Sequence, residues 1–239
     1  MKKRNIVFVV LLTIFVTISV LSIRHQVKLT KEAAEMKTYL ENRHNLEFVL
    51  VEPLYNWKFG SYGGSYYPKG HPDKRFYAEK MKNGYVASSF VEEWWVKQAE
   101  TELTPLVKEK LGEDVVISIS PVHGVDEELN ITHPIPSYKE VKSSLSVFIT
   151  FKETWKNDQK RKQQMIDIVQ MNQQRNIEET TFSFENKDKS QYNISIYTDK
   201  PIKTMKEFDE QAQVFYFDKE GFLSEAKIDG TIIGTVKEG

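Results

Sequence analysis

The sequence predicts an α+β fold, with an N-terminal transmembrane helix followed by a mainly antiparallel sheet and about three packed helices. Three observations predict it. An uncharged apolar run occupies residues 6–23. Behind this run, segments with helical periodicity alternate with short segments rich in β-branched and aromatic residues. A helix followed by two strands occurs three times before further strands, which favours antiparallel pairing with the helices on one face.

The apolar run from Ile6 to Ile23 has the length of a membrane span. Its 18 residues would rise roughly 27 Å as a helix, close to the hydrocarbon thickness of a bilayer. A cleavable signal has a shorter apolar core, about 7 to 15 residues, and small residues at the cut. Cleavage at Thr17-Ile18-Ser19 is the alternative to an uncleaved anchor, which we expect. Lipid attachment at a cysteine is excluded because the chain has no cysteine.

Charges on the two flanks of this run do not by themselves decide its orientation. Three cations, Lys2, Lys3 and Arg4, precede the run, but further cations follow it closely. A very short tail with three cations is hard to translocate, whereas long domains translocate largely regardless of their charge. We therefore expect a single-pass cell-membrane protein with a cytoplasmic N-terminus and with residues 25–239 outside the cytoplasm.

The overall composition narrows the classes of partner. The 33 basic and 34 acidic residues nearly cancel, to a net charge of −1, so nucleic acid is not expected as a partner. The absence of cysteine excludes disulfides, zinc–thiolate sites and cysteine catalysis. No cofactor-binding motif occurs, and no cofactor is expected. Aromatic residues make up 12% of the chain and charged residues 28%, which fits a folded, well-solvated domain.

We divide the chain into three parts. Residues 1–24 form a cytoplasmic tail and anchor, residues 25–45 a juxtamembrane amphipathic helix, and residues 46–239 an extracytoplasmic α+β domain with a possible subdomain boundary near Thr154. The juxtamembrane helix is predicted by one apolar stripe, formed by Leu29, Ala33, Met36 and Leu40. This stripe is expected to pack on the domain's own sheet; a short parallel coiled coil is the alternative, although only about two heptads are present.

Within the domain, the first strand is predicted over Leu46–Val51, stopped by Pro53, with its partner at Arg75–Met81 across a long loop. A helix over Ala87–Glu102 is followed by Thr104-Pro105, which predicts a kink or a second short helix ending at Leu111. The remaining expected elements are strands Val115–Ser120 and Leu145–Phe151, a helix over Lys156–Arg175, a hairpin of Thr180–Glu185 with Tyr192–Tyr197, and a three-stranded meander over Val214–Val236.

The long loop is the best candidate binding surface. Residues 55–70 combine four glycines with six aromatic residues, Tyr55, Trp57, Phe59, Tyr62, Tyr66 and Tyr67. Tyrosine and tryptophan offer large contact area with a polar tip, and glycines let the backbone adapt, a composition that recurs in binding loops. The plainer interpretation is a loop whose aromatics pack over the sheet as a satellite core.

Histidine clusters give a weaker signal for catalysis. The two sets are His71 with Asp73, and His123 with Asp126, Glu127 and His133. Neither shows the helical i, i+4 spacing of a metal site, so solvated loop residues are the plainer interpretation. No Gly-x-Ser-x-Gly motif occurs, and no residue is assigned a catalytic or metal-binding role.

Three sequence features resemble small, uncharacterised, single-span envelope proteins of Gram-positive, Bacillus-like bacteria. They are the MKKRN start with its apolar run, Tyr39-Leu40-Glu41 leading into Phe48, and the stretch from Phe59 to Gly64 ahead of Tyr66-Tyr67-Pro68. The resemblance covers about the first 80 residues. It implies a location at the membrane and carries over no functional residue.

The sequence therefore favours a membrane-anchored, extracytoplasmic binding or accessory module of the bacterial cell envelope. Its expected partners are the bilayer, through residues 6–23, and an envelope protein or cell-wall ligand. One alternative is an envelope hydrolase using His123, Asp126 and His133. The other is a structural subunit of a membrane complex.

Overall fold

The computed structural model describes residues 3–122, 130–141, 145–197 and 200–235. The chain forms two compact units, one of residues 1–90 with 126–134 and the other of residues 91–125 with 135–239. The division between these two units falls after Phe90. Thr154 lies inside the second unit, in the connection between the strand at residues 145–151 and the helix at residues 159–173.

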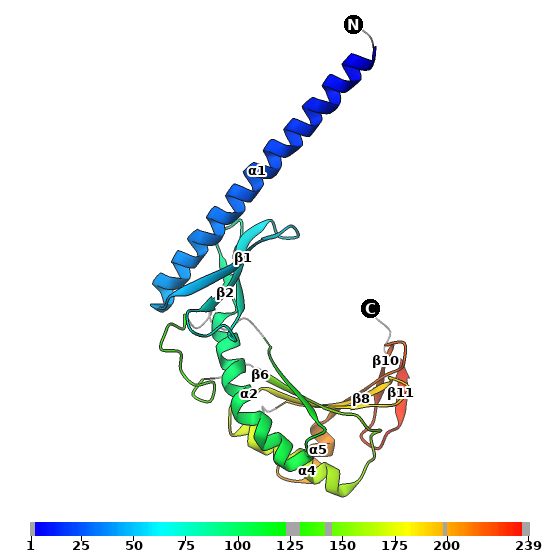
Figure 1. Cartoon of the computed structure of the whole chain (residues 1–239). Helices are drawn as coiled ribbons and strands as arrows, with labels where there is room; N and C mark the ends of the chain where they lie inside the picture. Colours follow the sequence, from blue (N-terminus) through cyan, green and yellow to red (C-terminus); the bar gives the residue numbers. More distant parts are fainter. Residues whose placement is uncertain (1–2, 123–129, 142–144, 198–199, 236–239) are drawn as a thin grey trace. The chain divides into compact units, whose positions relative to one another are not determined.

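The long helix α1 (Lys3–His44) is continuous from the apolar run into the first unit (Figure 1). Apolar side chains between Phe8 and Ile23 are exposed, and the helix is long and apolar enough to fit a transmembrane anchor or a signal sequence. Its second half carries the predicted stripe, and Leu29, Ala33, Met36 and Leu40 are all buried. The structure thus confirms that this stripe packs on the sheet of its own chain.

The first unit contains a four-stranded antiparallel sheet covered by α1. Its strands are β1 (Phe48–Asn56), β2 (Ser61–Pro68), β3 (Phe76–Lys80) and β4 (Val86–Ser88), and they lie in chain order. Strand β1 was expected to stop before Pro53 but continues to Asn56. Because β1 is an edge strand, the N–H that proline lacks is not needed by a neighbouring strand.

Half of the aromatic stretch 55–70, which was predicted to be a loop, is strand β2, which pairs with β1 on one side and β3 on the other. Its glycines are required by close approach rather than by flexibility. A Cβ on Gly63 would collide with the carbonyl of Ala78, and a Cβ on Gly64 would lie 2.8 Å from the carbonyl oxygen of Glu52. The sequence pattern missed this strand because glycine and serine take the places of an apolar alternation.

The second unit is built on a seven-stranded sheet with the order β11-β10-β9-β8-β7-β6-β5. All neighbouring strands are antiparallel except β6 and β7, which are connected by a helix as parallel pairing requires. The strands are β5 (Val116–Pro121), β6 (Leu145–Phe151), β7 (Glu179–Glu185), β8 (Gln191–Tyr197), β9 (Gln213–Phe217), β10 (Leu223–Ala226) and β11 (Ile232–Thr235).

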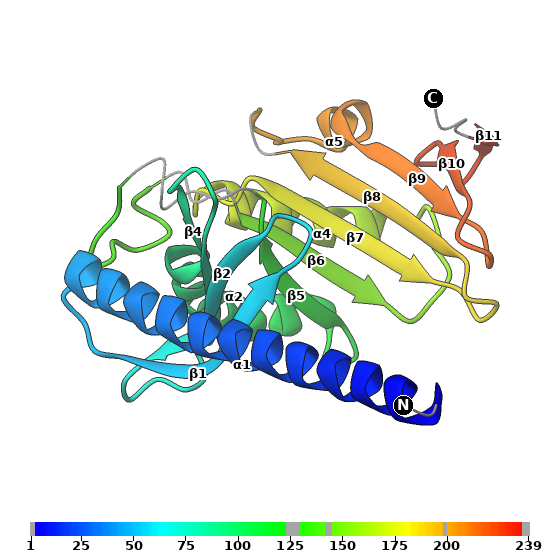
Figure 2. The same cartoon turned by 90° about the horizontal axis from the view of Figure 1, so that it is seen from above.

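Three helices, α2 (Phe90–Leu111), α4 (Gln159–Gln173) and α5 (Met205–Gln211), lie on one face of this sheet (Figures 1 and 2). The α+β class, the antiparallel pairing and the three further helices agree with the sequence prediction. Helix α2 is a single helix with Pro105 inside it, not two short helices. Its predicted stripe, Val91, Trp95, Ala99 and Leu103, is fully buried.

Helix α5 was not predicted, although a local signal for it exists. Thr204 accepts a hydrogen bond from the N–H of Glu207, and the Glu207 carboxylate accepts one from the N–H of Thr204. This reciprocal arrangement is a capping box, recognisable as Thr-x-x-Glu in the sequence. Only Phe208 of the helix is buried, so there was no apolar periodicity to reveal it.

Candidate functional site

The aromatic stretch singled out in the sequence forms the end of the β1–β2 hairpin, and its residues divide into three groups. Tyr55 and Tyr62 face each other across the hairpin with ring centroids 4.7 Å apart. The imidazole of His25, on α1, meets the Tyr55 ring edge-on at 5.2 Å. The ammonium of Lys28 lies 4.4 Å from the centre of the Tyr62 ring. These two tyrosines therefore attach the hairpin to α1.

The turn between the strands presents the second group. Trp57 is 84% exposed and Phe59 is 52% exposed. The turn is stabilised by the side-chain oxygen of Asn56, which accepts a hydrogen bond from the N–H of Lys58. Gly60 has a positive φ of 63°, which favours glycine. Trp57 and Phe59 are thus held by a defined turn, and both rings stay largely exposed, although the ammonium of Lys58 lies 5.3 Å from the centre of the Phe59 ring.

Tyr66 and Tyr67 form the third group, and Tyr66 belongs to the core. The Tyr66 side chain is fully buried, and its hydroxyl donates to the carbonyl oxygen of Ala33 on α1, at 2.9 Å. Burial raises the pKa of Tyr66 far above its ordinary value. Tyr67 is half-buried and lies on the opposite face of the sheet, since successive residues of a strand alternate. Of the six predicted residues, only Trp57 and Phe59 are largely exposed at one tip.

A second surface, which the sequence analysis did not single out, is the face of the seven-stranded sheet opposite its helices. None of the described elements of the second unit covers this face, which we call the helix-free face. Its central positions follow from the strand register: Ser118, Phe148, Thr181 and Ser195 in one row, and Thr150, Ser183, Asn193 and Phe215 in the next. The alternate positions, which face the helices, are mainly Ile, Val and Phe.

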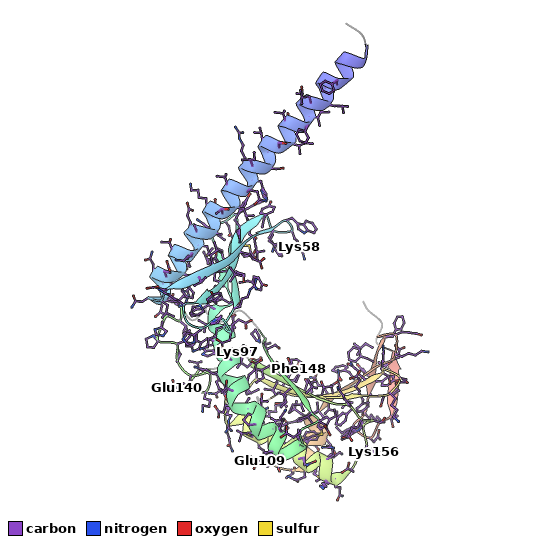
Figure 3. The ribbon with its side chains drawn as sticks, in the orientation of Figure 1. Lys58, Lys97, Glu109, Glu140, Phe148 and Lys156 are labelled. Carbon is purple, nitrogen blue, oxygen red and sulfur yellow. The ribbon has the colours of Figure 1, made fainter. Side chains whose placement is uncertain are left out.

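The helix-free face is held rigid by its own hydrogen bonds. The hydroxyls of Thr181 and Ser195 are 2.7 Å apart, and the Ser146 hydroxyl donates to the Glu179 carboxylate at 2.9 Å. The negative charge of Glu179 raises the pKa of Tyr197, which is 42% exposed. Phe148, labelled in Figure 3, is 37% exposed among these polar groups. Ser146, Thr181 and Ser195 are themselves buried, so the polar groups that this face leaves at least partly accessible are Ser118, Thr150, Ser183 and Asn193, beside the exposed rings of Phe148 and Tyr197.

A cavity and the two predicted histidine sets are the other features that could support catalysis or metal binding. A cavity of about 250 Å³ lies between α1 and the β3–β4 hairpin, lined in part by Glu32, Glu35 and Lys80. Among the residues that the structure describes, no group of three or more His, Asp or Glu side chains is arranged to hold a metal ion. The predicted His71–Asp73 set is exposed. Of the second set, His123, Asp126 and Glu127 lie outside the described residues.

Comparisons with known proteins leave the family open. No family model matches the chain, and no curated protein matches it. Among solved structures, the chain is similar to a DUF5037 family protein from Ruminococcus gnavus ATCC 29149, with a TM-score of 0.40 and 10% identity over 86% of this chain and 94% of that one.

Proposed function

We propose that the protein is an uncleaved, single-pass membrane protein whose extracytoplasmic domain binds a polar ligand of the bacterial cell envelope. The observation that carries this proposal is the helix-free face of the second unit. The rest of the proposal, namely the anchor and its orientation, rests on the apolar run and on the cations that precede it.

The chemistry of the helix-free face suits a ligand rich in hydroxyl and amide groups. Serine, threonine and asparagine side chains both donate and accept hydrogen bonds, so they match sugars and peptide backbones alike. Exposed rings such as Phe148 and Tyr197 add apolar contact between the polar positions. The repeated spacing of strands favours an extended polymer, and we propose a cell-wall polysaccharide.

The continuity of α1 supports the membrane location of the first unit, and hence of the chain that carries the binding surface. The same helix supplies the apolar run and the buried stripe of the first unit, so the span is attached to the folded domain without a linker. A protein built this way is held close to the membrane surface, where the inner layer of the cell wall lies. Binding a wall polymer there would fix the domain between membrane and wall.

The test is co-sedimentation of the full-length protein, in lipid nanodiscs, with purified cell-wall polysaccharide. Replacing both Phe148 and Tyr197 with alanine is expected to weaken binding at least tenfold. The matched control is Tyr77→Ala, which removes an aromatic ring of similar exposure, 56%, from the first unit and should leave binding unchanged. Equal binding by all three proteins would refute the assigned surface.

Two other outcomes would replace the proposal. Absence of any polysaccharide binding, together with reproducible cross-linking to a membrane protein, would favour the structural-subunit alternative. Release of soluble fragments from the polysaccharide would favour the hydrolase alternative. In that case His123, Asp126 and His133 would be the first residues to replace.

A further inference from the structure

Strand β1 runs back along α1 towards the apolar run. Its far end, where the β1–β2 turn begins, lies level with His25 of α1. At the start of β1, the Phe48 ring lies 6.2 Å from the His44 ring at the end of α1. Near the end of β1, the Tyr55 ring lies 5.2 Å from the ring of His25. The strand therefore retraces 19 helix positions, and the turn extends from the end of β1, which lies level with the start of the juxtamembrane segment (Figure 1).

This level coincides with the edge of the bilayer if the apolar run spans it. His25 is only two residues beyond Ile23, about 3 Å along the helix axis. The headgroup layer on each side of the hydrocarbon is roughly 5–7 Å thick. Groups level with His25 thus lie within the headgroup layer, and the β1–β2 turn extends from this level.

The residues at the turn have the chemistry of a membrane interface. Trp57 is the most exposed large apolar side chain among those described, and Phe59 in the same turn is also exposed. Tryptophan is enriched at the headgroup level because its ring is apolar while its N–H still donates a hydrogen bond. The exposed side chains of Trp57 and Phe59, two positions apart at the hairpin tip, are not needed by the core of the first unit.

Cations lie at and near the turn, and the ammonium of Lys58 lies 5.3 Å from the centre of the Phe59 ring. Lys58, labelled in Figure 3, lies between Trp57 and Phe59 in the sequence. The side chain of Lys82 lies against Gly60 at the end of the turn. Arg24 and Lys28 follow the apolar run on α1 at the same level. Positive side chains at this height match the phosphate groups of an anionic bilayer.

We infer that the β1–β2 turn inserts Trp57 and Phe59 into the headgroup layer of the membrane that α1 spans, as a second membrane contact. The inference rests on the proposed anchor. A helix alone leaves the attached domain free to rotate about the helix axis. A second contact on one side of the helix fixes which face of the first unit points to the membrane.

Site-directed spin labelling tests this contact, because a chain without cysteine accepts one label at a chosen position. The full-length protein is reconstituted in vesicles of phosphatidylglycerol and phosphatidylethanolamine. Three variants are labelled separately: Leu12→Cys in the middle of the apolar run, Lys58→Cys at the turn, and Asp73→Cys in the β2–β3 connection at the other end of the sheet. Each label is then exposed to oxygen, which concentrates in lipid, and to a water-soluble nickel chelate.

The label at position 58 is expected to show an oxygen-to-chelate accessibility ratio several-fold above that at position 73, and below that at position 12. Adding Trp57→Ser and Phe59→Ser to the Lys58→Cys variant should lower the ratio to that of position 73. Because both rings are exposed, this double change should leave the circular dichroism spectrum and unfolding midpoint unchanged, which separates loss of contact from loss of fold.

The three positions distinguish the possible failures. If position 12 is lipid-exposed while position 58 matches position 73, the second contact is wrong and the anchor stands. If position 12 is itself water-accessible, the proposed anchor is wrong, and the second contact is wrong with it.

Discussion

Both sheets of the protein are covered by helices on one face, but the side chains packed against those helices differ between the two units. In the first unit, α1 and the sheet enclose the aromatic rings of Phe48, Tyr66, Phe76 and Phe90, together with a fully buried histidine, His44. In the second unit, the helices also carry buried charge. The ammonium of Lys162, on α4, lies 2.7 and 2.9 Å from the two carboxylate oxygens of Asp209, on α5.

Glu102 shows the same use of charge in the second unit. Its carboxylate receives hydrogen bonds from Tyr138 and Arg175 and pairs with Lys139. Partial burial acts to raise the pKa of Glu102, but these donors outweigh it and the pKa is lowered. The difference teaches that the helix contact of the first unit consists mainly of uncharged rings, whereas the second unit, which also has stacked rings such as Phe151 and Phe184, adds ion pairs between its helices.

The largest effect should follow from removing a ring from the first unit. Phe76 is fully buried and its ring centroid lies 4.9 Å from that of Phe90 and 5.5 Å from that of Phe48. Phe76→Ala should lower the free energy of unfolding by about 3–5 kcal/mol, since it leaves a cavity in a packed aromatic cluster. Urea unfolding of the full chain in detergent micelles, read by hydrogen exchange of peptides from residues 46–90, measures this loss.

The neighbouring residue provides the control for this change. Tyr77 follows Phe76 in the same strand but is 56% exposed. Tyr77→Ala should change the free energy of unfolding by no more than about 0.5 kcal/mol. Similar losses for the two variants would contradict the view that ring contacts on the helix side hold the first unit together.

A pH dependence should also appear in the first unit, because His44 is buried without a hydrogen-bond partner among the residues that the structure describes. Burial, with the nearby charges of Arg43 and His133, lowers the pKa of His44 from 6.5 to about 4. Between these two values the unfolded chain binds a proton that the folded protein does not. Stability is therefore complete above pH 6.5 and falls by about 3 kcal/mol as the pH drops to 4.

Comparing the wild type with His44→Gln isolates this contribution, because glutamine has no charge to gain. The variant should be less stable at pH 7, where it loses the ring contact with Phe90, 4.6 Å between centroids. Its unfolding free energy should then change less than that of the wild type between pH 6.5 and pH 4.5. Parallel pH profiles for the two proteins would show that His44 is not the titrating group.

Sequence patterns predicted the elements that have one clear apolar period. The stripes of α1 and α2 and the alternation in β6 were all visible, since these faces are filled by Leu, Ile, Val and aromatic residues. Strand β2 was invisible because Tyr62, Gly64 and Tyr66 face the helix side at every second position, and glycine breaks the apolar count. The division after Phe90 also left no signal, because α2 begins at Phe90 almost directly after β4, with no linker between them.

The candidate sites were predicted only in part, for a related reason. Six aromatic residues looked alike in the sequence, yet Tyr66 is core and Trp57 is exposed. What separates them is tertiary: Tyr66 reaches the carbonyl of Ala33, 33 residues earlier, while Trp57 lies in a turn. The helix-free face was overlooked because alternating polar residues are the ordinary sign of a solvated sheet face.

The smallest effect is expected from the ion pair between Lys162 and Asp209, which joins two helices of the second unit. Asp209→Ala leaves the ammonium of Lys162, a side chain only 9% exposed, without its carboxylate. Asp209 itself is 37% exposed, so solvent screens part of the loss, and the expected cost is about 1–2 kcal/mol. Lys162→Met should cost less than Asp209→Ala, since a flexible apolar side chain fills the same space without a charge to solvate.

Hydrogen exchange of peptides from α4 and α5 measures both variants, and Lys206→Ala serves as the control. Lys206 pairs with Glu210 on the surface of α5, at 3.7 Å, with both side chains largely exposed, so its removal should have almost no effect. If Lys162→Met proved as costly as Asp209→Ala, the ion pair itself would be the source of stability. A larger loss for Asp209→Ala than for Lys162→Met would instead mean that Asp209 mainly compensates the buried charge of Lys162. The rings of the first unit, by contrast, contribute stability directly through their packing.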